Sequence, residues 1–328
     1  MKRHIVLVIG ALAATATIAQ AQSKPSEPQC ANTTPVTGPA TQNTCNTAID
    51  LFNYMAPQLG SVIAGGNTTL GQGGSLGGPG HFAISIRGNA IKGSLPQLDN
   101  YNPGTTVGSK TIVAKDQLLG LPAVDVAFGL FAGLPLGVTK VGGVDVLLNG
   151  SYIPEYSGAG VDVKVPSGSL KIGYGVRVGL LEESLIVPGI GFSYMKRDLP
   201  TVSVTAQNGP ISFSVTNLRV NTTSWRLTAS KSLIMFGLAA GLGQDKYSSS
   251  AQIQGTLAPG VSSAQFKGKQ DLTRTTYFAD VTMNVMLAKL VAEIGQVSGG
   301  SVPTYNTFSG TAADASRLFG SVGLRIGF

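Results

Sequence analysis

The stretch LKIGYGVRVGL, residues 170–180, carries an apolar side chain at every second position, with glycine, lysine or arginine between them. Alternation with a period of two is typical of a β-strand that has two unlike faces. In a soluble sandwich the second face would be rich in threonine, lysine and glutamate, whereas here it is small or singly charged. The stretch therefore predicts a strand of about eleven residues whose apolar face meets something other than water.

The same alternation recurs from residue 80 to the end of the chain. It is found in the stretches 82–87, 124–130, 144–148, 190–194, 211–229, 234–243, 277–285 and 290–294. Short connections alternate with turn-rich ones that contain Gly, Pro and Asn, a pattern typical of membrane-spanning meanders. Because hydrocarbon offers no water to an unpaired backbone group, such a sheet must close on itself. We predict an all-β, antiparallel, up-and-down transmembrane β-barrel over residues 80–328, with about ten strands and twelve as the main alternative.

The composition agrees with a folded membrane protein. Hydrophobic residues make up 43% of the 328 residues and charged residues only 12%, about half the share in an ordinary soluble domain. Such a chain is too apolar for a disordered tail. The mature chain has no window of 18 uncharged apolar residues, so a helical membrane protein is excluded.

The N-terminus predicts export. A basic start at residues 2–4, an apolar stretch at 5–18 and Ala19-Gln20-Ala21 together form a secretory signal peptide over residues 1–21.

Cys30 and Cys45 are the only cysteines, and in an oxidising compartment they favour one disulfide, with two free thiols as the alternative. Without Lys2 and Arg3 the formal charge falls from +7 to +5, and the basic residues are scattered. Nucleic acid is therefore not an expected partner.

The last eight residues, SVGLRIGF at 321–328, end the chain on an aromatic residue. Here the sequence resembles Gram-negative outer-membrane β-barrel proteins, whose final strand ends in a signal of the form polar, any, Gly, any, any, apolar, any, aromatic. The resemblance implies that the barrel-assembly machinery reads Ser321, Gly323, Ile326 and Phe328. It also implies that the protein resides in the outer membrane.

Charged residues with inward parity define the candidate lumen. They are Arg87, Asp125, Asp145, Lys171, Arg177, Arg226, Asp280, Glu293 and Arg325. One interpretation is a polar passage whose opposed charges form a constriction. The other is an ion-pair network that fills a narrow barrel. In both, each buried charge needs a partner.

Residues 22–79 precede the barrel. The pattern of Ile49, Leu51, Phe52 and Met55 predicts a short amphipathic helix over 47–55 that Pro57 ends, followed by a flexible Gly-rich tether at 65–80. This segment could fold back as a plug or hang in the periplasm. The arrangement is similar in architecture to FadL-type transporters of hydrophobic compounds, in which an N-terminal hatch sits in the barrel. That family has more strands and a longer chain, so no residue is carried across.

The chain lacks the residues that barrel enzymes use. Its mature part holds one histidine, His81, at the start of the first strand, where an interfacial or capping role is expected. We therefore predict no enzymatic activity, no cofactor and no metal site.

Two functions remain open at this stage. The first is a passive channel or binding barrel for a small solute, hydrophobic compounds included. The alternative is a structural or surface-interaction barrel with a filled lumen, whose projecting hairpins bind a partner, lipopolysaccharide or another surface. Lys196, Arg197, Lys267 and Lys269 are expected near the outer rim, where they could meet lipid phosphates. Outer-membrane lipid and lipopolysaccharide are the expected partners.

Overall fold

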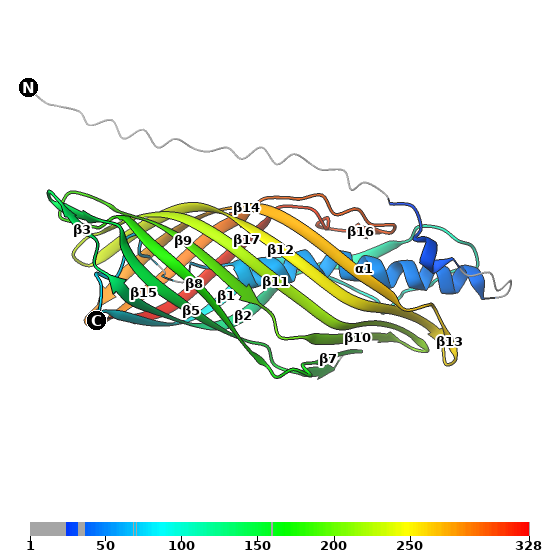
Figure 1. Ribbon diagram of the computed structural model, residues 1–328. Helices are drawn as coiled ribbons and strands as arrows, with labels where there is room; N and C mark the ends of the chain where they lie inside the picture. Colours follow the sequence, from blue (N-terminus) through cyan, green and yellow to red (C-terminus); the bar gives the residue numbers. More distant parts are fainter. Residues whose placement is uncertain (1–23, 32–36, 68, 70, 159, 328) are drawn as a thin grey trace, which may run out of the picture.

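A computed structural model describes residues 24–31, 37–67, 69, 71–158 and 160–327. The predicted signal peptide and Phe328 lie outside the described residues. Ten antiparallel strands pair in sequence around a closed ring, which the pairing of β11 with β12 completes (Figure 1). In ring order they are β12 (Phe236–Ala258), β14 (Phe266–Val285), β15 (Ala288–Val297), β17 (Arg317–Gly327), β1 (Phe82–Pro96), β2 (Thr111–Phe131), β5 (Gly143–Tyr152), β8 (Leu170–Leu181), β9 (Gly189–Asp198) and β11 (Ile211–Ser232). We call this ring the barrel.

The sheet as a whole contains fifteen strands, more than the sequence predicts. The additional strands extend the sheet beyond the ring, and four of them, with two to four residues each, are too short to show a period of their own. They are β6 (Tyr156–Gly158), β7 (Val161–Lys164), β10 (Val202–Asn208), β13 (Val261–Ser262) and β16 (Thr307–Ser309). A separate hairpin of β3 (Leu134–Leu136) and β4 (Thr139–Val141) lies between β2 and β5.

The barrel has two unlike ends. The turn end, on the left in Figure 1, holds the β3–β4 hairpin, the start of β1 and the end of β17. The loop end, on the right, holds the β12–β13 turn and the long connections 97–110 and 298–316. β11 and β12, with 22 and 23 residues, are about twice as long as a membrane crossing needs. They therefore reach past any membrane toward the loop end.

The outer face of the barrel is an apolar belt next to the turn end. On β14 the outward side chains from Val285 back to Tyr277 are apolar, and beyond Tyr277 they become polar. The neighbouring β12 changes in the same way after Leu242. On β9, β11 and β14 outward aromatic side chains border the belt where it ends: Tyr194, Trp225 and Tyr277.

The helix α1 (Gly38–Ala64) lies inside the barrel and packs against β1, β2, β9, β11, β12 and β14. It is longer than predicted, because Pro57 does not end it. Proline removes one backbone N–H and leaves the carbonyl four residues earlier without its helical donor. That carbonyl, on Asn53, accepts a hydrogen bond from Gln270 Nε2 of the wall at 3.2 Å. None of the described helices is long and apolar enough to cross a membrane.

Candidate functional site

The interior of the barrel is the candidate functional site. Eight of the nine predicted lumen charges have buried side chains: Arg87, Asp125, Asp145, Arg177, Arg226, Asp280, Glu293 and Arg325. The prediction for Lys171 was wrong, because its side chain is exposed. Lys171 is the second residue of β8, at the rim of the ring. Strand parity identifies the face that a side chain takes but not its depth along the barrel.

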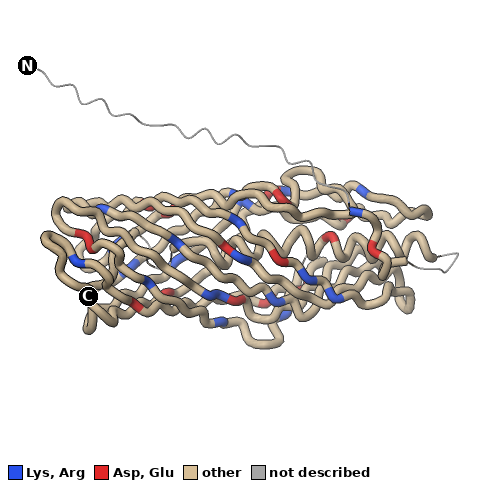
Figure 2. Tube along the Cα trace, turned by 45° about the horizontal axis from the view of Figure 1, so that its top comes forward, with Lys and Arg blue, Asp and Glu red and all other residues tan. Residues whose placement is uncertain are grey.

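Three ion pairs join neighbouring strands across the inner wall. Arg87 pairs with Asp125, Arg177 Nη2 lies 2.7 Å from Asp145 Oδ2, and Arg226 Nη1 lies 2.6 Å from Asp245 Oδ1. Their side chains are 0–6% exposed. Buried charges need such partners, because leaving one without compensation is costly. Figure 2 shows charged residues spread along the barrel rather than gathered in one ring.

The C-terminus of α1 ends among three arginines. Arg197 Nη1 donates to Ala64 O at 2.9 Å, Arg226 Nη2 donates to the same oxygen at 3.1 Å, and Arg87 Nη1 donates to Gly65 O at 3.0 Å. The last four carbonyls of a helix have no partner within the helix, and this end of the helix dipole is negative. The guanidinium groups therefore satisfy both the hydrogen-bonding and the electrostatic needs of the buried helix end.

The described residues of the segment 65–81, which are 65–67, 69 and 71–81 and are here called the thread, continue from α1 through the lumen to the turn end. Side-chain oxygens of the wall accept hydrogen bonds from backbone N–H groups of the thread. The pairs are Asn67 N to Glu293 Oε2 at 3.1 Å, Gly71 N to Asp280 Oδ2 at 3.0 Å, Gly73 N to Ser230 Oγ at 2.8 Å, Ser75 N to Glu182 Oε2 at 2.8 Å and Leu76 N to Asp145 Oδ1 at 3.1 Å. The predicted flexible tether is therefore a bound segment.

Glycines let the thread lie directly against the wall. A Cβ on Gly191 of β9 would lie 2.0 Å from Gly73 O, and a Cβ on Gly73 would lie 2.4 Å from Gly189 O. Contacts this short do not occur between real atoms, so backbone meets backbone here. The small inward residues in the first half of β9, Gly189, Gly191 and Ser193, therefore make room for a second chain in the lumen.

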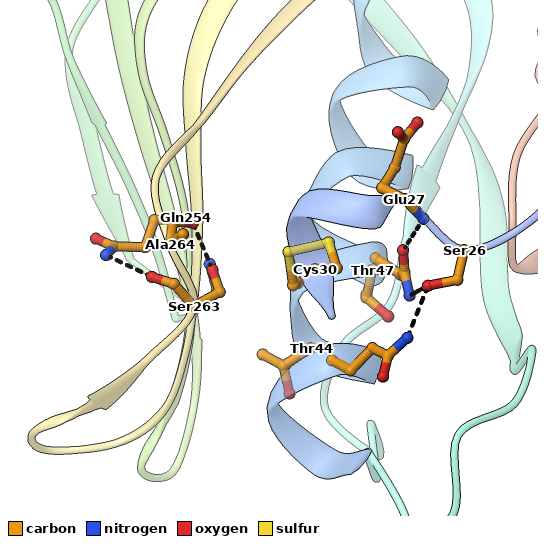
Figure 3. The surroundings of a disulfide bond; sticks show 12 residues. Ser26, Glu27, Cys30, Thr44, Thr47, Gln254, Ser263 and Ala264 are labelled. Atoms are coloured by element: carbon orange, nitrogen blue, oxygen red, sulfur yellow. Dashed lines mark hydrogen bonds between the residues drawn. A yellow bond between two sulfur atoms is a disulfide. The ribbon is translucent and has the colours of Figure 1, made fainter. Parts of the chain in front are cut away.

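The loop end of the lumen is closed by α1 and the segment before it. Cys30 and Cys45 form a disulfide that ties the 3-10 turn η1 (Pro28–Cys30) to α1 (Figure 3). Nearby, Ser26 Oγ accepts hydrogen bonds from Gln42 and Asn46. These contacts hold residues 24–31 at the loop end.

A buried carboxylate ties α1 to the connection 298–316. Asp50 accepts hydrogen bonds from Tyr305 N at 3.0 Å and from Asn306 N at 2.7 Å. It lies at the loop end, outside the apolar belt. Burial raises the pKa of Asp50 to about 6, although the hydrogen bonds from Asn306 and Tyr305 act in the opposite direction.

A cavity of about 500 Å³ opens at the turn end, beside the thread. Its lining includes Gly71, Ser75, Lys140, Glu182, Lys289 and Arg325. This space is polar and mixed in charge. It lies between the bound thread and the turns that connect the strands.

The sequence interpretation missed several buried charges of the inner wall, among them Arg197, Asp245 and Arg274. Arg197 was placed on the outer rim with Lys196, but its side chain is 3% exposed and binds the end of α1. Adjacent strand residues face opposite ways, so an outward Lys196 already implied an inward Arg197. Asp245 shares the inward parity of Gly243 on β12 and could have been found in the same way.

The described part of the predicted targeting signal, residues 321–327, forms the end of β17, and Phe328 lies outside the described residues. Ser321 and Gly323 are buried on the inner side, and Ser321 Oγ donates to Asn89 Oδ1 at 2.7 Å. Ile326 faces outward and is 41% exposed. His81 is exposed just before β1. Among the described residues, no group of three or more His, Cys, Asp or Glu side chains could hold a metal ion.

No protein-family model and no curated protein sequence matches the chain. Among solved structures it is similar to Ail, the attachment invasion locus protein of Yersinia pestis, at 12% identity over 76% of this chain and 99% of Ail, with a TM-score of 0.23. A mutant of the TodX monoaromatic hydrocarbon channel aligns at 6% identity over 81% and 97%, with a TM-score of 0.34. The transport unit of the autotransporter AIDA-I from Escherichia coli aligns at 8% identity over 88% and 99%, with a TM-score of 0.26.

These structures are outer-membrane β-barrels, the class that the sequence resemblance predicted. At such identities and TM-scores, the functions of these proteins do not carry over to this chain.

Proposed function

We propose that this chain is an outer-membrane barrel whose lumen is closed to solutes by its own N-terminal segment, and that it acts at the cell surface. The observation that carries the proposal is the filled lumen. Helix α1 occupies the half toward the loop end, and the thread occupies the half toward the turn end. The wall binds both through charged side chains.

The apolar belt supports the membrane location. The stretch of β14 from Tyr277 to Val285 has nine residues. At about 3.3 Å per residue and a tilt near 40°, it spans roughly 20 Å along the membrane normal. Met286 and Leu287, 99% and 73% exposed, continue the belt into the turn. The apolar band of an outer-membrane barrel is about 25 Å tall. Leucine, isoleucine and tyrosine on this belt would be costly in water and are favourable against lipid tails.

A basic patch outside the belt supports a surface role. Lys196 and Lys246 are both Cα partners of Thr223, so one threonine separates them on the outer face of β9, β11 and β12. This row lies one outward position beyond Tyr194 and Trp225, at the border of the belt. The exposed Arg219 and Lys269 lie farther toward the loop end on the same wall. We propose that the patch binds phosphate groups of outer-leaflet lipopolysaccharide.

Conductance tests the closed lumen. In planar bilayers we expect the full chain to stay silent at ordinary holding voltages, because the helix and the thread block the path. Insertion is verified on the same preparation by the accessibility of an epitope placed at Gly260, in the loop-end turn after β12. A steady ohmic current from the inserted full chain would overturn the closed-barrel proposal.

The lipid contact has its own test. Replacing Lys196 and Lys246 by serine should weaken binding to vesicles that contain lipid A by about tenfold or more, since a lysine near an anionic surface contributes about 1 kcal/mol. The matched control replaces Lys115 and Lys140, which are also exposed but lie away from the patch. Equal losses of vesicle binding in the two double variants would mean that net charge alone, and not the patch, causes the binding.

We also propose that the barrel-assembly machinery reads the chain end. Phe328→Ser should lower the amount of folded protein in the outer membrane several-fold, while refolding of the purified chain in detergent stays unchanged. Unchanged membrane levels would contradict this role. We propose no catalytic activity for the barrel.

A second candidate is a gated channel for a small solute. The cavity of about 500 Å³ beside the thread favours it, because withdrawal of the thread would connect this space with the rest of the lumen. Such a channel would show voltage-dependent openings that disappear when the thread is cross-linked to the wall. A full chain that never opens, with or without the cross-link, would remove this candidate.

A further inference from the structure

The direction of the N-terminal segment sets the starting point. Helix α1 begins at the loop end, where Asn43 Nδ2 donates to Pro103 O at 2.7 Å. It ends inside the barrel, and the thread then leaves at the turn end, where Gly129 N donates to His81 O at 2.9 Å. β1 starts there, beside the end of β17 (Figure 1). Residues 24–31 therefore lie at the opposite end of the molecule from the start of β1 and the end of β17.

The wall recognises this segment through its backbone. Arginines donate to the carbonyls of residues 63–66, and acidic side chains accept from the amides of Asn67, Gly71, Ser75 and Leu76. Arg177 Nη1 also donates to Gln72 O at 3.5 Å. Among the described thread residues, Asn67 adds one side-chain bond to the wall, to Thr228 Oγ1 at 3.4 Å. These wall groups bind backbone amides and carbonyls, which every residue carries, and the close approach of Gly73 to Gly189 O makes a glycine-rich chain the one that fits.

We propose that the lumen is a polypeptide conduit, through which the barrel carries its own N-terminal segment from the periplasmic side to the outer surface. The substrate class is an extended, unfolded chain joined covalently ahead of Gly38. The inference rests on the outer-membrane location proposed above. It assigns the buried charges a role beyond stability: they replace water for the passing backbone, so that its polar groups stay hydrogen-bonded inside the wall.

The disulfide fits the end of such a passage. Cys30–Cys45 fastens η1 beside the first turns of α1, so the segment at the loop end is wider than the single helix that fills the lumen. Asp50 and its two backbone donors add a second attachment at the same level. Together they keep the segment from sliding back toward the turn end.

Epitope display on intact cells tests the proposal. One tag is placed between residues 23 and 24, a second at Gly260 at the loop end, and a third at Gly137 in the β3–β4 turn at the turn end. We expect the first two tags to bind antibody on intact cells and the third only after permeabilisation. An N-terminal tag that needs permeabilisation while the Gly260 tag does not would overturn the conduit. A Gly260 tag that is hidden on intact cells would instead overturn the proposed orientation in the outer membrane.

A cargo series tests whether display is passage through the lumen. A flexible Gly/Ser-rich extension fused ahead of residue 24 should reach the surface, because it presents backbone and little else. A stably folded domain at the same place should lower display at least tenfold relative to the Gly260 tag on the same molecules. Equal display of the folded domain would contradict passage as an extended chain.

Wall and thread variants separate backbone recognition from side-chain recognition. Gln72→Ala changes a thread side chain and should leave display of the extension within twofold of the parent. Glu182→Gln alters a wall acceptor of Ser75 N and should lower display several-fold at equal Gly260 signal. A larger loss of display in Gln72→Ala than in Glu182→Gln would overturn recognition through the backbone.

Discussion

The two halves of the lumen are filled in opposite ways. Toward the loop end, α1 packs apolar side chains such as Phe52 and Ile63 against an apolar wall that includes Ile91, Phe213 and Ile253. Toward the turn end, the thread offers few side chains, and the wall binds its backbone with arginine and carboxylate groups. A helix satisfies its own backbone, so its surroundings can be apolar, whereas an extended single chain cannot. The distribution of charge in the barrel therefore follows the secondary structure of the segment that fills it.

The first prediction removes a wall charge where the two halves meet. Asp245 is 1% exposed and accepts hydrogen bonds from Arg226 at 2.6 Å and from Thr276 at 2.5 Å. Asp245→Ala leaves the Arg226 guanidinium buried without its partner, so we expect a loss of about 3–5 kcal/mol in the free energy of unfolding. Urea unfolding in detergent measures it, with the fluorescence of Trp225, the only tryptophan, as the signal.

The matched control for Asp245 is an exposed pair on the next strand. Lys269 Nζ lies 3.1 Å from Asp271 Oδ2, with both side chains largely in solvent. Asp271→Ala should cost less than about 0.5 kcal/mol. If Asp245→Ala and Asp271→Ala lower the free energy of unfolding by the same amount, the carboxylates of the lumen do not act as partners of buried charges.

The second prediction compares side-chain truncation in the two halves. Ile63 in α1 is 2% exposed, and Ile63→Ala should lower the free energy of unfolding by about 3 kcal/mol through lost burial and a cavity. Gln72→Ala in the thread should cost under about 1 kcal/mol, because it removes one neutral hydrogen bond, from Gln72 Nε2 to Ser75 O. Similar losses at the two positions would show that side chains hold both segments.

The third prediction concerns pH at the loop end. Burial raises the pKa of Asp50 to about 6, so the folded state holds a proton that the unfolded chain releases at lower pH. This contribution is complete at acid pH and is lost as the pH rises through about 6. The free energy of unfolding should fall by about 2 kcal/mol between about pH 4 and pH 7 from this group. Asp50→Asn should lack that fall, and an identical pH profile in the variant would contradict the assignment.

Sequence periodicity was enough to predict the barrel wall. Alternation on stretches such as 170–180 gave the strands, their faces and most of the buried charges, because inward and outward residues must alternate. Alternation wrongly placed Lys171 among the buried charges, because it identifies the face that a side chain takes but not the position of the residue along the barrel. It missed Arg197 because two adjacent residues of one strand were assigned to the same side.

The filling of the lumen could not be predicted in the same way. The thread has no period, and its partners are distant in sequence: Ser75 meets Glu182, and Asn67 meets Glu293. Helix α1 runs through Pro57, and Gln270 binds the carbonyl of Asn53 that the proline leaves without a donor, a contact between residues 217 positions apart. Such contacts exist only once the barrel has closed around the segment.

Hydrogen exchange of the thread amides tests the central claim most directly. On the folded full chain in detergent, the amides of Gly71, Gly73 and Ser75 should exchange about a hundredfold or more slower than in an unstructured peptide, because each donates to a side-chain oxygen of the barrel. The strand amides of the same sample serve as the reference for a folded barrel. Slow strands with thread amides that exchange at the free-peptide rate would contradict a lumen filled and bound by its own N-terminal segment.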